Sequence, residues 1–276
     1  MSTKGVYETK LKNGKPSYRA SLTTGSRHVS LGSFAVEKDA AKAYEQGRRI
    51  LEDKSLKIDK LEKIAAKYKL SFQKIVLLMN LRDNGIYIPS PIYVYNRYFC
   101  YYLSSSEYLT FDREDLFYYA SRRIMRRGGH LFVAEYGMQT SVISRYGIRP
   151  FAVKGRDYRF INGDDTDFRY SNIEIINPYH GVLRMGDFGQ YRYKALLHIK
   201  GNHIIGIYDT PEEAAIAYNK AVDLAKKAGI TKDYPVNYLE NVPPYAYAEI
   251  YDGTKVSSKL LSYFASLTAS DNPQSL

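Results

Sequence analysis

The stretch YRASLTTGSRHVSLG, residues Tyr18 to Gly32, predicts a β-hairpin that opens into a larger motif. Apolar and polar residues alternate before and after a turn at residues 24–26, which is the pattern of half-buried strands. The residues expected on the buried face are Tyr18, Ala20, Leu22, Val29 and Leu31. After Gly32 the apolar spacing becomes helical, so a helix is expected to pack on that face.

The same pattern occurs a second time near the C-terminus. GVYETKLKNGKPSYRASLTTGSRHVSLGSFAVEKDAAKAYEQGRRIL, which starts at Gly5, is repeated as GVLRMGDFGQYRYKALLHIKGNHIIGIYDTPEEAAIAYNKAVDLA, which starts at Gly181. Matching positions include Gly5-Val6 and Gly181-Val182, Ala20 and Ala195, Gly32 and Gly206, Phe34 and Tyr208, Ala40-Ala41 and Ala214-Ala215, and Tyr44 and Tyr218. Self-similarity of this kind indicates a duplication. Each copy is predicted to be a three-stranded antiparallel sheet with one helix.

The helix of the second copy has a clear start signal. Thr210 is a good N-cap, Pro211 suits the first turn, and Glu213 completes a capping box. Small alanines in both helices would let each helix lie close to its sheet. The predicted fold class is therefore α+β.

Composition and charge favour an anionic partner. The chain has 276 residues and a net charge of +11, with 40 Lys and Arg against 29 Asp and Glu. Such an excess attracts nucleic acid. The single cysteine, Cys100, excludes internal disulfides and multi-cysteine zinc sites. The first twenty residues lack the apolar segment of a signal peptide, and no apolar run is long enough to cross a membrane, so we expect a cytoplasmic protein.

The sheet faces opposite the helices are the first candidate site. They would carry Arg19, Ser21, Thr23, His28 and Ser30 in the first copy, and Lys194, Leu196, His198, Asn202 and Ile204 in the second. A polar outer face of an antiparallel sheet is often only solvated. A sheet of this width also fits the DNA major groove, where such side chains reach base edges.

The repeated pattern of Gly-Val, an aromatic residue before Ala, Leu-Gly before an aromatic residue, and Ala-Ala before Tyr resembles the Apetala-two/ethylene-response-factor (ERF) DNA-binding domain. The segment Pro235-Val236-Asn237-Tyr238 is similar to the ending of bacterial and phage members. The resemblance implies a sheet in the major groove. By position it implicates Lys10, Ser21, Thr23, His28 and Ser30 in the first copy, and Arg184, Leu196, His198, Asn202 and Ile204 in the second. Both copies depart from the plant members of the family: strand positions that are Arg and Trp in those members are Ser, Thr, Leu and Ile in this chain.

The middle of the chain resembles the HNH endonuclease family. The residues on which this resemblance rests are the stretch from His130 to Tyr136, Ile161-Asn162-Gly163-Asp164, and Ser171-Asn172-Ile173. The resemblance implies a ββα-metal domain between the two ERF-like modules. It also places Phe160 where the family has its general-base histidine, Arg159 at the acidic neighbour and Phe168 at the central asparagine.

Phosphodiester hydrolysis of this kind needs a base and a metal ion, and phenylalanine supplies neither. We therefore predict a degenerate HNH-like domain with no catalytic residues, no metal site and no cofactor. Asp164, Asp165 and Asp167 are expected to be turn formers. Substitute ligands such as Asp157, Asp164 or His130 would be needed for an active nuclease.

A cluster of arginines precedes the HNH-like stretch. We expect a helix that begins at Asp112, carries Arg122, Arg123, Arg126 and Arg127 on one side of its last turns, and ends at Gly128-Gly129. These arginines complement the helix dipole. They are also candidates for phosphate binding.

The expected organisation has five parts. Residues 1–52 and 179–240 are the ERF-type modules, 53–85 a basic helical linker, 86–178 the degenerate HNH-like domain, and 241–276 a tail with a short helix near Ser258 to Ser266. The linker has an apolar stripe. The tail is a candidate surface for a homodimer.

The sequence thus favours a double-stranded DNA-binding protein, a transcriptional regulator or repressor of phage or mobile-element type that evolved from a homing endonuclease and no longer cuts. The alternatives are an active metal-dependent HNH endonuclease and a protein-interaction module or inhibitor that uses its basic surface.

Overall fold

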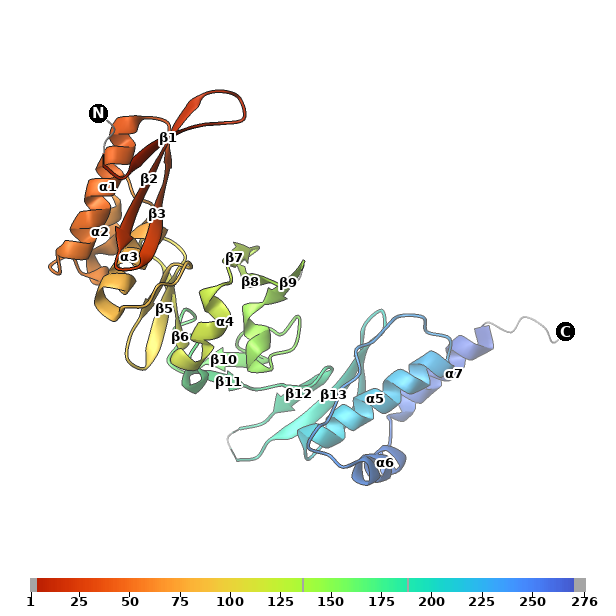
Figure 1. The fold of residues 1–276 in the computed structure, drawn as a ribbon. Coiled ribbons are helices and arrows are strands. Elements are labelled where there is room, and N and C mark those ends of the chain that lie inside the picture. The colour runs from red at the N-terminus through yellow and green to blue at the C-terminus, as the bar shows by residue number, and fades with distance from the viewer. Residues whose placement is uncertain (1–3, 136, 188, 271–276) are drawn as a thin grey trace. The chain divides into compact units, whose positions relative to one another are not determined.

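The computed structural model describes residues 4–135, 137–187 and 189–270. The chain forms an α+β fold with several small antiparallel sheets, and it divides into two units (Figure 1). The first unit comprises residues 1–142 and 162–172, and the second residues 143–161 and 173–276. The five ranges expected from the sequence divide the chain more finely and stay a prediction. Within the described residues, no helix has the length and apolar content needed to cross a membrane.

The first copy of the repeat, here called module 1 (residues 5–52), has the expected architecture. Strands β1 (Val6–Lys10), β2 (Pro16–Thr24) and β3 (Arg27–Phe34) form an antiparallel sheet, and helix α1 (Glu37–Glu52) packs on one face. Ala20, Leu22 and Val29 point toward that helix and are buried, as the alternation predicts. This apolar face is the reason why the sheet and the helix form together.

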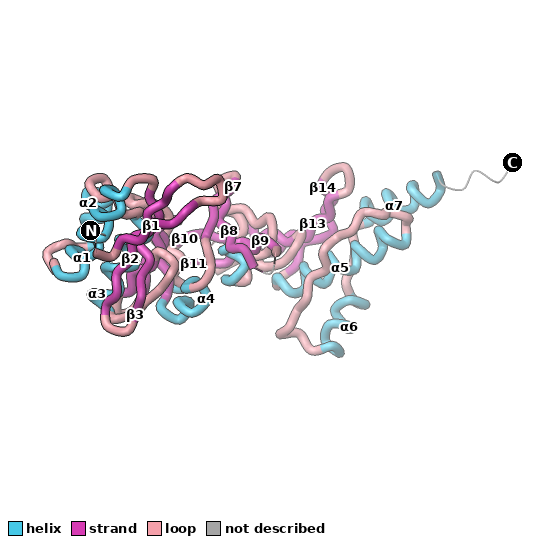
Figure 2. The backbone as a smooth tube through the Cα atoms, turned by 45° about the horizontal axis from the view of Figure 1, so that its top comes forward, coloured by secondary structure: helices cyan, strands magenta, loops and turns pink. Residues whose placement is uncertain are grey.

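The second copy, module 2 (residues 181–227), repeats this architecture in the second unit. Strands β12 (Val182–Met185), β13 (Arg192–His198) and β14 (Asn202–Tyr208) form the sheet, and helix α5 (Pro211–Lys227) lies along β13 (Figures 1 and 2). The capping box is present, because the Thr210 hydroxyl accepts from the Glu213 amide at 3.2 Å and the Glu213 carboxylate accepts from the Thr210 amide at 3.3 Å. The predicted helix start is confirmed.

A β-bulge recurs at the same place in both modules. Ala20 pairs with Gly32 but Ser21 pairs with Ser30, so Leu31 is the extra residue of β3. In module 2, Ala195 pairs with Gly206 and Leu196 with Ile204, so that Ile205 is extra. Both extra residues are buried. The bulge adds local twist and lets one more side chain enter the core under the helix.

A glycine directly before the first strand of each module packs against the ring of a tyrosine in the helix. Gly5 has φ +75° and Gly181 φ +68°, a left-handed conformation that glycine adopts without strain. A Cβ on Gly5 would lie 2.1 Å from the ring of Tyr44, and one on Gly181 would lie 2.2 Å from the ring of Tyr218. The Gly5 carbonyl also accepts from the Ser21 amide at 2.9 Å. The repeated glycine and tyrosine are therefore one packing unit.

The segment expected to be a helical linker is broken and contributes to the core of the first unit. A 3-10 turn (Ile58–Lys60) and α2 (Leu61–Ala65) come first, and α3 (Phe72–Asn84) follows after a break. The expected apolar stripe is buried in α2, but α3 is buried over the whole run from Ile75 to Asn80. Helix α3 packs on α1 and on β4 (Ile92–Val94). The segment is helical, as expected, but α3 departs from the expected amphipathic pattern because it has apolar residues on all its sides.

Two further sheets complete the first unit. Strands β4, β5 (Tyr98–Tyr102) and β6 (Tyr108–Asp112) form one sheet, and β7 (Ile124–Arg127), β8 (His130–Glu135) and β9 (Met138–Ser141) form the other. Between them lie a 3-10 turn (Arg113–Asp115) and the short helix α4 (Leu116–Ala120).

The predicted arginine-bearing helix was wrong in its second half. The helix ends at Ala120, and Arg126 and Arg127 lie on strand β7. Gly128 and Gly129, both with positive φ, form the turn between β7 and β8 rather than a helix end. Two consecutive glycines suit a tight hairpin turn, and pairing of Ile124 with Val133 in the strand outweighs the helical preference of the arginines.

Strands β10 (Tyr158–Phe160) and β11 (Ile173–Ile175) pair antiparallel in the second unit. The chain then runs from β11 to β12 without a helix. The loop between β10 and β11, residues 161–172, is called the polar loop below; its residues from Asn162 onward belong to the first unit.

The C-terminal segment folds onto module 2. Helix α7 (Ser258–Ser270) confirms the expected short helix, and α6 (Pro244–Gly253) precedes it. Leu260 and Phe264 are buried in the module 2 core, and the Ser257 hydroxyl donates to the Ile204 carbonyl at 2.6 Å. The tail therefore covers the outer edge of the sheet beside β14.

Candidate nucleic-acid interface

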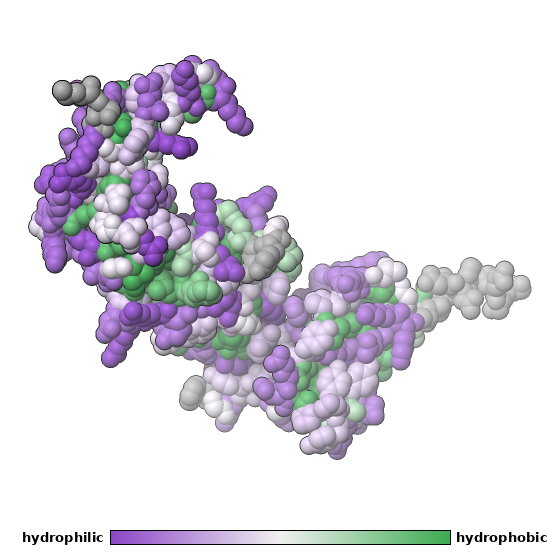
Figure 3. Space-filling view, viewed as in Figure 1, coloured by the Kyte–Doolittle hydropathy of each residue, from purple (hydrophilic) through white to green (hydrophobic). Residues whose placement is uncertain are grey.

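The sheet face opposite α1, called outer face 1, carries mostly polar side chains. Its first row crosses all three strands, because Tyr7 pairs with Arg19 and Arg19 with Ser33. A second row is Ser21 with Ser30, and a third is Thr23 with His28. Arg19, Thr23, His28 and Ser30 are exposed, as expected. Beyond this face, hydrophilic residues cover the β1–β2 hairpin (Figure 3).

The sheet face opposite α5, called outer face 2, has the same three rows. Leu183 pairs with Lys194 and Lys194 with Ile207 in the first row. Leu196 pairs with Ile204 in the second row, and His198 with Asn202 in the third. In Figure 3 the surface of module 2 mixes hydrophobic and hydrophilic residues. A basic residue thus occupies the centre of the first row in both modules.

The third row is a polar cross-strand pair in both modules. The Thr23 hydroxyl lies 3.5 Å from His28 Nδ1, and His198 Nδ1 lies 2.9 Å from the Asn202 side-chain oxygen. All four side chains are exposed at the end of the β2–β3 or β13–β14 hairpin. Each pair brings a histidine and a second polar side chain together at the exposed end of the sheet face.

Of the residues implicated by sequence, two lie on the other face of their sheet and one is buried. Ser21 is on outer face 1 but is only 8% exposed. Alternation along β1 puts Lys10 on the face of buried Val6, since both occupy even positions of the same strand. Arg184 likewise lies on the face of buried Val182. Its guanidinium lies 4.3 Å from the Tyr191 ring centroid and 3.5 Å from the Glu174 carboxylate on β11, so its contacts are internal to the second unit.

The four arginines of residues 122–127 do not form one patch on a helix. Arg122 donates to the Tyr118 carbonyl at 2.9 Å and stacks over the Tyr118 ring at 4.1 Å. Arg126 binds Glu107 through a bidentate pair, with one contact of 3.1 Å. Arg126 and Arg127 are neighbours on a strand, so their side chains point to opposite faces. Arg123 and Arg127 are exposed.

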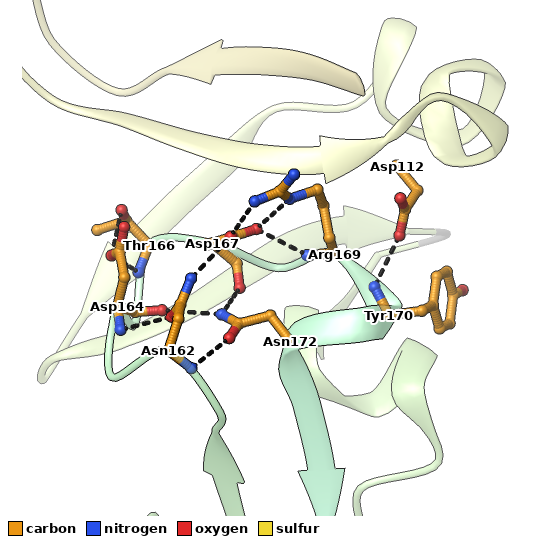
Figure 4. Close-up of polar contacts among 8 residues, drawn as sticks. All are labelled: Asp112, Asn162, Asp164, Thr166, Asp167, Arg169, Tyr170 and Asn172. Carbon is orange, nitrogen blue, oxygen red and sulfur yellow. Dashed lines mark hydrogen bonds and ion pairs between the residues drawn. The ribbon is translucent and has the colours of Figure 1, made fainter. Parts of the chain in front are cut away.

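The polar loop is a closed hydrogen-bond network (Figure 4). Asn172 is the hub: its side-chain oxygen accepts from the Asn162 amide at 2.8 Å, and its side-chain nitrogen donates to the Asp167 carbonyl at 2.8 Å. Asp167 accepts from both Arg169 and the Asn162 side chain, at 2.8 Å and 3.1 Å. Asp164 accepts from the amide and hydroxyl of Thr166.

The Asp164 and Asp167 carboxylates of the network accept hydrogen bonds from neighbouring protein groups. Burial alone would raise the pKa of Asp167, but hydrogen bonds from Arg169 and its backbone outweigh burial, so this pKa lies below its usual value. Asp164 and Asp167 thus act as turn and ion-pair residues, as the sequence suggested for the acidic turn. Among the residues that the structure describes, no three His, Cys, Asp or Glu side chains gather in a way that could hold a metal ion.

The two phenylalanines differ in their roles. Phe168 is buried, and its ring stacks on Phe111 at 5.5 Å in the first unit. Phe160 lies at the end of β10, half-buried, with its ring 6.0 Å from that of Tyr158. Phe168 therefore fills core space, whereas Phe160 packs within its own hairpin.

Asp157 is a buried carboxylate of the second unit and was one of the substitute ligands considered for an active nuclease. Its side chain is fully buried between Arg149, at 2.9 Å, and Arg156, at 2.8 Å. The Val153 amide also donates to it at 2.8 Å. Burial raises the pKa of Asp157, but these donors lower it more. Its contacts are those of a structural ion pair that closes the loop before β10.

The outer faces are wider than the site residues expected from the sequence. Tyr7, Ser33, Leu183 and Ile207 belong to them but were not among the expected site residues. Pairing of the edge strands puts them beside Arg19 and Lys194, and the bulge sets which residues of β3 and β14 share the face. Alternation along the third strand of each module was the available signal for Ser33 and Ile207. The bulge shifts the pairing of that strand, so simple alternation does not give the correct face.

No protein-family model, curated protein or solved structure matches the chain.

Proposed function

We propose that the chain is a sequence-specific double-stranded DNA-binding protein without nuclease activity, in which modules 1 and 2 each set an outer sheet face into a major groove. The observation that carries the proposal is the repetition of one arrangement on both faces. A basic residue, Arg19 or Lys194, is central in the first row. An exposed pair of one histidine and one other polar residue lies at the end of each face. Three-stranded sheets of this size fit the major groove, where these groups reach phosphates and base edges.

Charge and the polar loop support the same function. A net charge of +11 favours binding to a polyanion. In the polar loop, Arg169 pairs with Asp167. Phe160 at the end of β10 and Phe168 in the loop stand where an HNH-type nuclease would carry its base and its asparagine. This part of the chain would act as a spacer in a transcriptional regulator, a repressor of phage or mobile-element type, derived from an HNH homing endonuclease with two ERF-type modules.

The test is selection of duplexes from a random DNA pool by the full chain in the presence of Mg²⁺, followed by sequencing and by gel analysis of strand length. We expect intact strands that are enriched in an extended or two-part motif. Strand scission that a Phe160→Ala variant retains and an Asp164→Ala variant lacks would instead support an active nuclease. Binding without enrichment would contradict sequence-specific recognition.

A matched pair of variants checks the interface itself. The double substitution Arg19→Gln and Lys194→Gln removes the central basic residue of each outer face. The control, Lys42→Gln with Lys226→Gln, removes the same charge from exposed positions of α1 and α5. We expect the first variant to lose binding to the selected duplex and the control to keep it. Equal losses would contradict the placement of DNA on the outer faces.

A further inference from the structure

The two outer faces differ in one systematic way. Each polar residue of module 1 has a structurally equivalent residue in module 2, because the strands, the bulge and the pairing are the same. The central basic residue is kept, and so is the polar pair of the third row. The remaining positions change from Tyr7, Ser33, Ser21 and Ser30 in module 1 to Leu183, Ile207, Leu196 and Ile204 in module 2.

The aliphatic residues of outer face 2 occupy adjacent positions in its first two rows. Leu183 and Ile207 flank Lys194 on either side, and Leu196 faces Ile204 in the next row. Directly opposed residues on one face of a sheet have Cβ atoms about 4.5–5.5 Å apart, which is within contact distance for the side chains of Leu196 and Ile204. Ile204 is 51% and Ile207 48% exposed. The module 2 core lies on the other side of the sheet, under α5.

The charge on this face restricts what can cover it. Lys194 lies within the aliphatic surface and forms no ion pair with any described residue, while the end of the face carries His198 and Asn202. A partner must therefore offer apolar groups close to negative charge. The DNA major groove does so, since each thymine places a C5 methyl group in the groove beside a phosphate backbone.

Resting on the proposed function, we infer that outer face 2 reads thymine methyl groups, whereas outer face 1 reads hydrogen-bonding base edges. Leu196 and Ile204 make the methyl contacts in the middle of the face, with Ile207 and Leu183 beside them, and Lys194 binds a phosphate. The duplication has thus produced two readers of different base chemistry. The target is expected to contain a T-rich half for module 2 and a half without this requirement for module 1.

The test compares thymine with deoxyuridine, which differs only by the C5 methyl group. The duplex selected by the wild-type chain is synthesised again with each T replaced in turn by U, and affinities are measured for the full chain. Removal of one contacted methyl group should weaken binding about fourfold, the value expected for one buried methyl group. The sensitive positions should lie together in one half of the site.

The variant Leu196→Ser with Ile204→Ser gives outer face 2 the serines of outer face 1. This variant should bind the selected duplex and each duplex with a single T-to-U replacement in the module 2 half equally. Its affinity should be close to that of the wild type for a duplex in which all contacted thymines are replaced by U. The control, Ser21→Ala with Ser30→Ala, should retain the full difference between T and U in the module 2 half.

The outcomes separate the two proposals. If the wild type selects a motif but binds T and U duplexes equally at every position, the methyl inference is overturned and the proposed function stands. If no motif is selected, the proposed function fails and the inference fails with it. If the face instead packs on a second copy of the chain, the wild type sediments as a dimer that the Leu196→Ser and Ile204→Ser variant dissociates, and the inference is again overturned.

Discussion

At the scale of single residues, the repeated glycine is the clearest case in which packing explains a sequence pattern. Gly5 combines a left-handed φ of +75° with a 2.1 Å approach of any Cβ to the Tyr44 ring. Gly14 has a similar φ of +78° but open space around it. Gly5→Ala should therefore loosen β1 and β2 far more than Gly14→Ala, which bears only the cost of about 1–2 kcal/mol for the left-handed conformation.

Hydrogen exchange of the β1 and β2 amides, read by mass spectrometry, checks this expectation. Gly5→Ala should accelerate exchange of the Ser21 amide, whose hydrogen bond goes to the Gly5 carbonyl. Equal exchange in the two alanine variants would show that the Tyr44 contact does not fix the strand.

A second prediction at this scale concerns Asp167. Its pKa is lower in the folded chain than its usual value of 3.8, so its ionised form stabilises the fold at pH values above 3.8. That contribution is lost as the pH falls below 3.8 and through the folded pKa. Asp167→Asn should cost about 1–3 kcal/mol at pH 7, and the difference from wild type should shrink on acidification below pH 3.8.

Native-state hydrogen exchange of the polar loop, measured at pH 6 and 7, gives the loss of stability at neutral pH. Thermal unfolding between pH 2 and 5 shows whether the difference from wild type shrinks on acidification. Asp164→Asn is the control, since Asp164 lies at the exposed end of the loop and accepts from its neighbour Thr166. A difference between Asp167→Asn and wild type that stays constant down to pH 2 would contradict the assignment.

At the scale of elements, the two modules differ in how their helices begin. Thr210 caps α5 with a full capping box, whereas Val36 occupies the same place before α1 and has no capping side chain. Val36 is also 54% exposed, so a change there disturbs little of the core. Thr210→Ala should destabilise α5 by about 1 kcal/mol, and Val36→Thr should stabilise α1 by a similar amount.

The measurement is the free energy of opening of the first-turn amides in each helix, from native-state hydrogen exchange. Thr24→Ala, at the end of β2 and away from any helix start, serves as the control. A gain in α1 with no loss in α5 would show that the capping box of module 2 is redundant with its tail contacts.

At the scale of the whole molecule, binding to DNA should depend steeply on salt, because each neutralised phosphate contributes about −0.9 to the slope of log K against log salt concentration. Arg19→Gln and Lys194→Gln should each reduce the magnitude of that slope by about 1. Equilibrium binding to the selected duplex between about 50 and 200 mM salt measures this slope.

Linkage of two modules in one chain gives a further expectation for the same experiment. A site with both halves should bind about 10²- to 10⁴-fold more tightly than a site with one half, since the second module then binds at high effective concentration. A slope that is unchanged in both variants, or equal affinity for half and full sites, would contradict binding through two modules.

The sequence by itself determined the parts in which local pattern and packing agree. Alternation around Tyr18 to Gly32, the switch to helical spacing and the capping box at Thr210 specified both modules, because each uses one apolar face that must be covered. Tertiary structure decided the rest. Arg126 and Arg127 are on a strand because Ile124 pairs with Val133 across the Gly128-Gly129 turn, and the sequence pattern alone did not choose between this hairpin and a helix that ends at the two glycines. The bulge beside Leu31 and Ile205, which is invisible to simple alternation, decided which side chains share each outer face. Long-range pairing sets strand register, so the sequence could indicate the faces but not their complete membership.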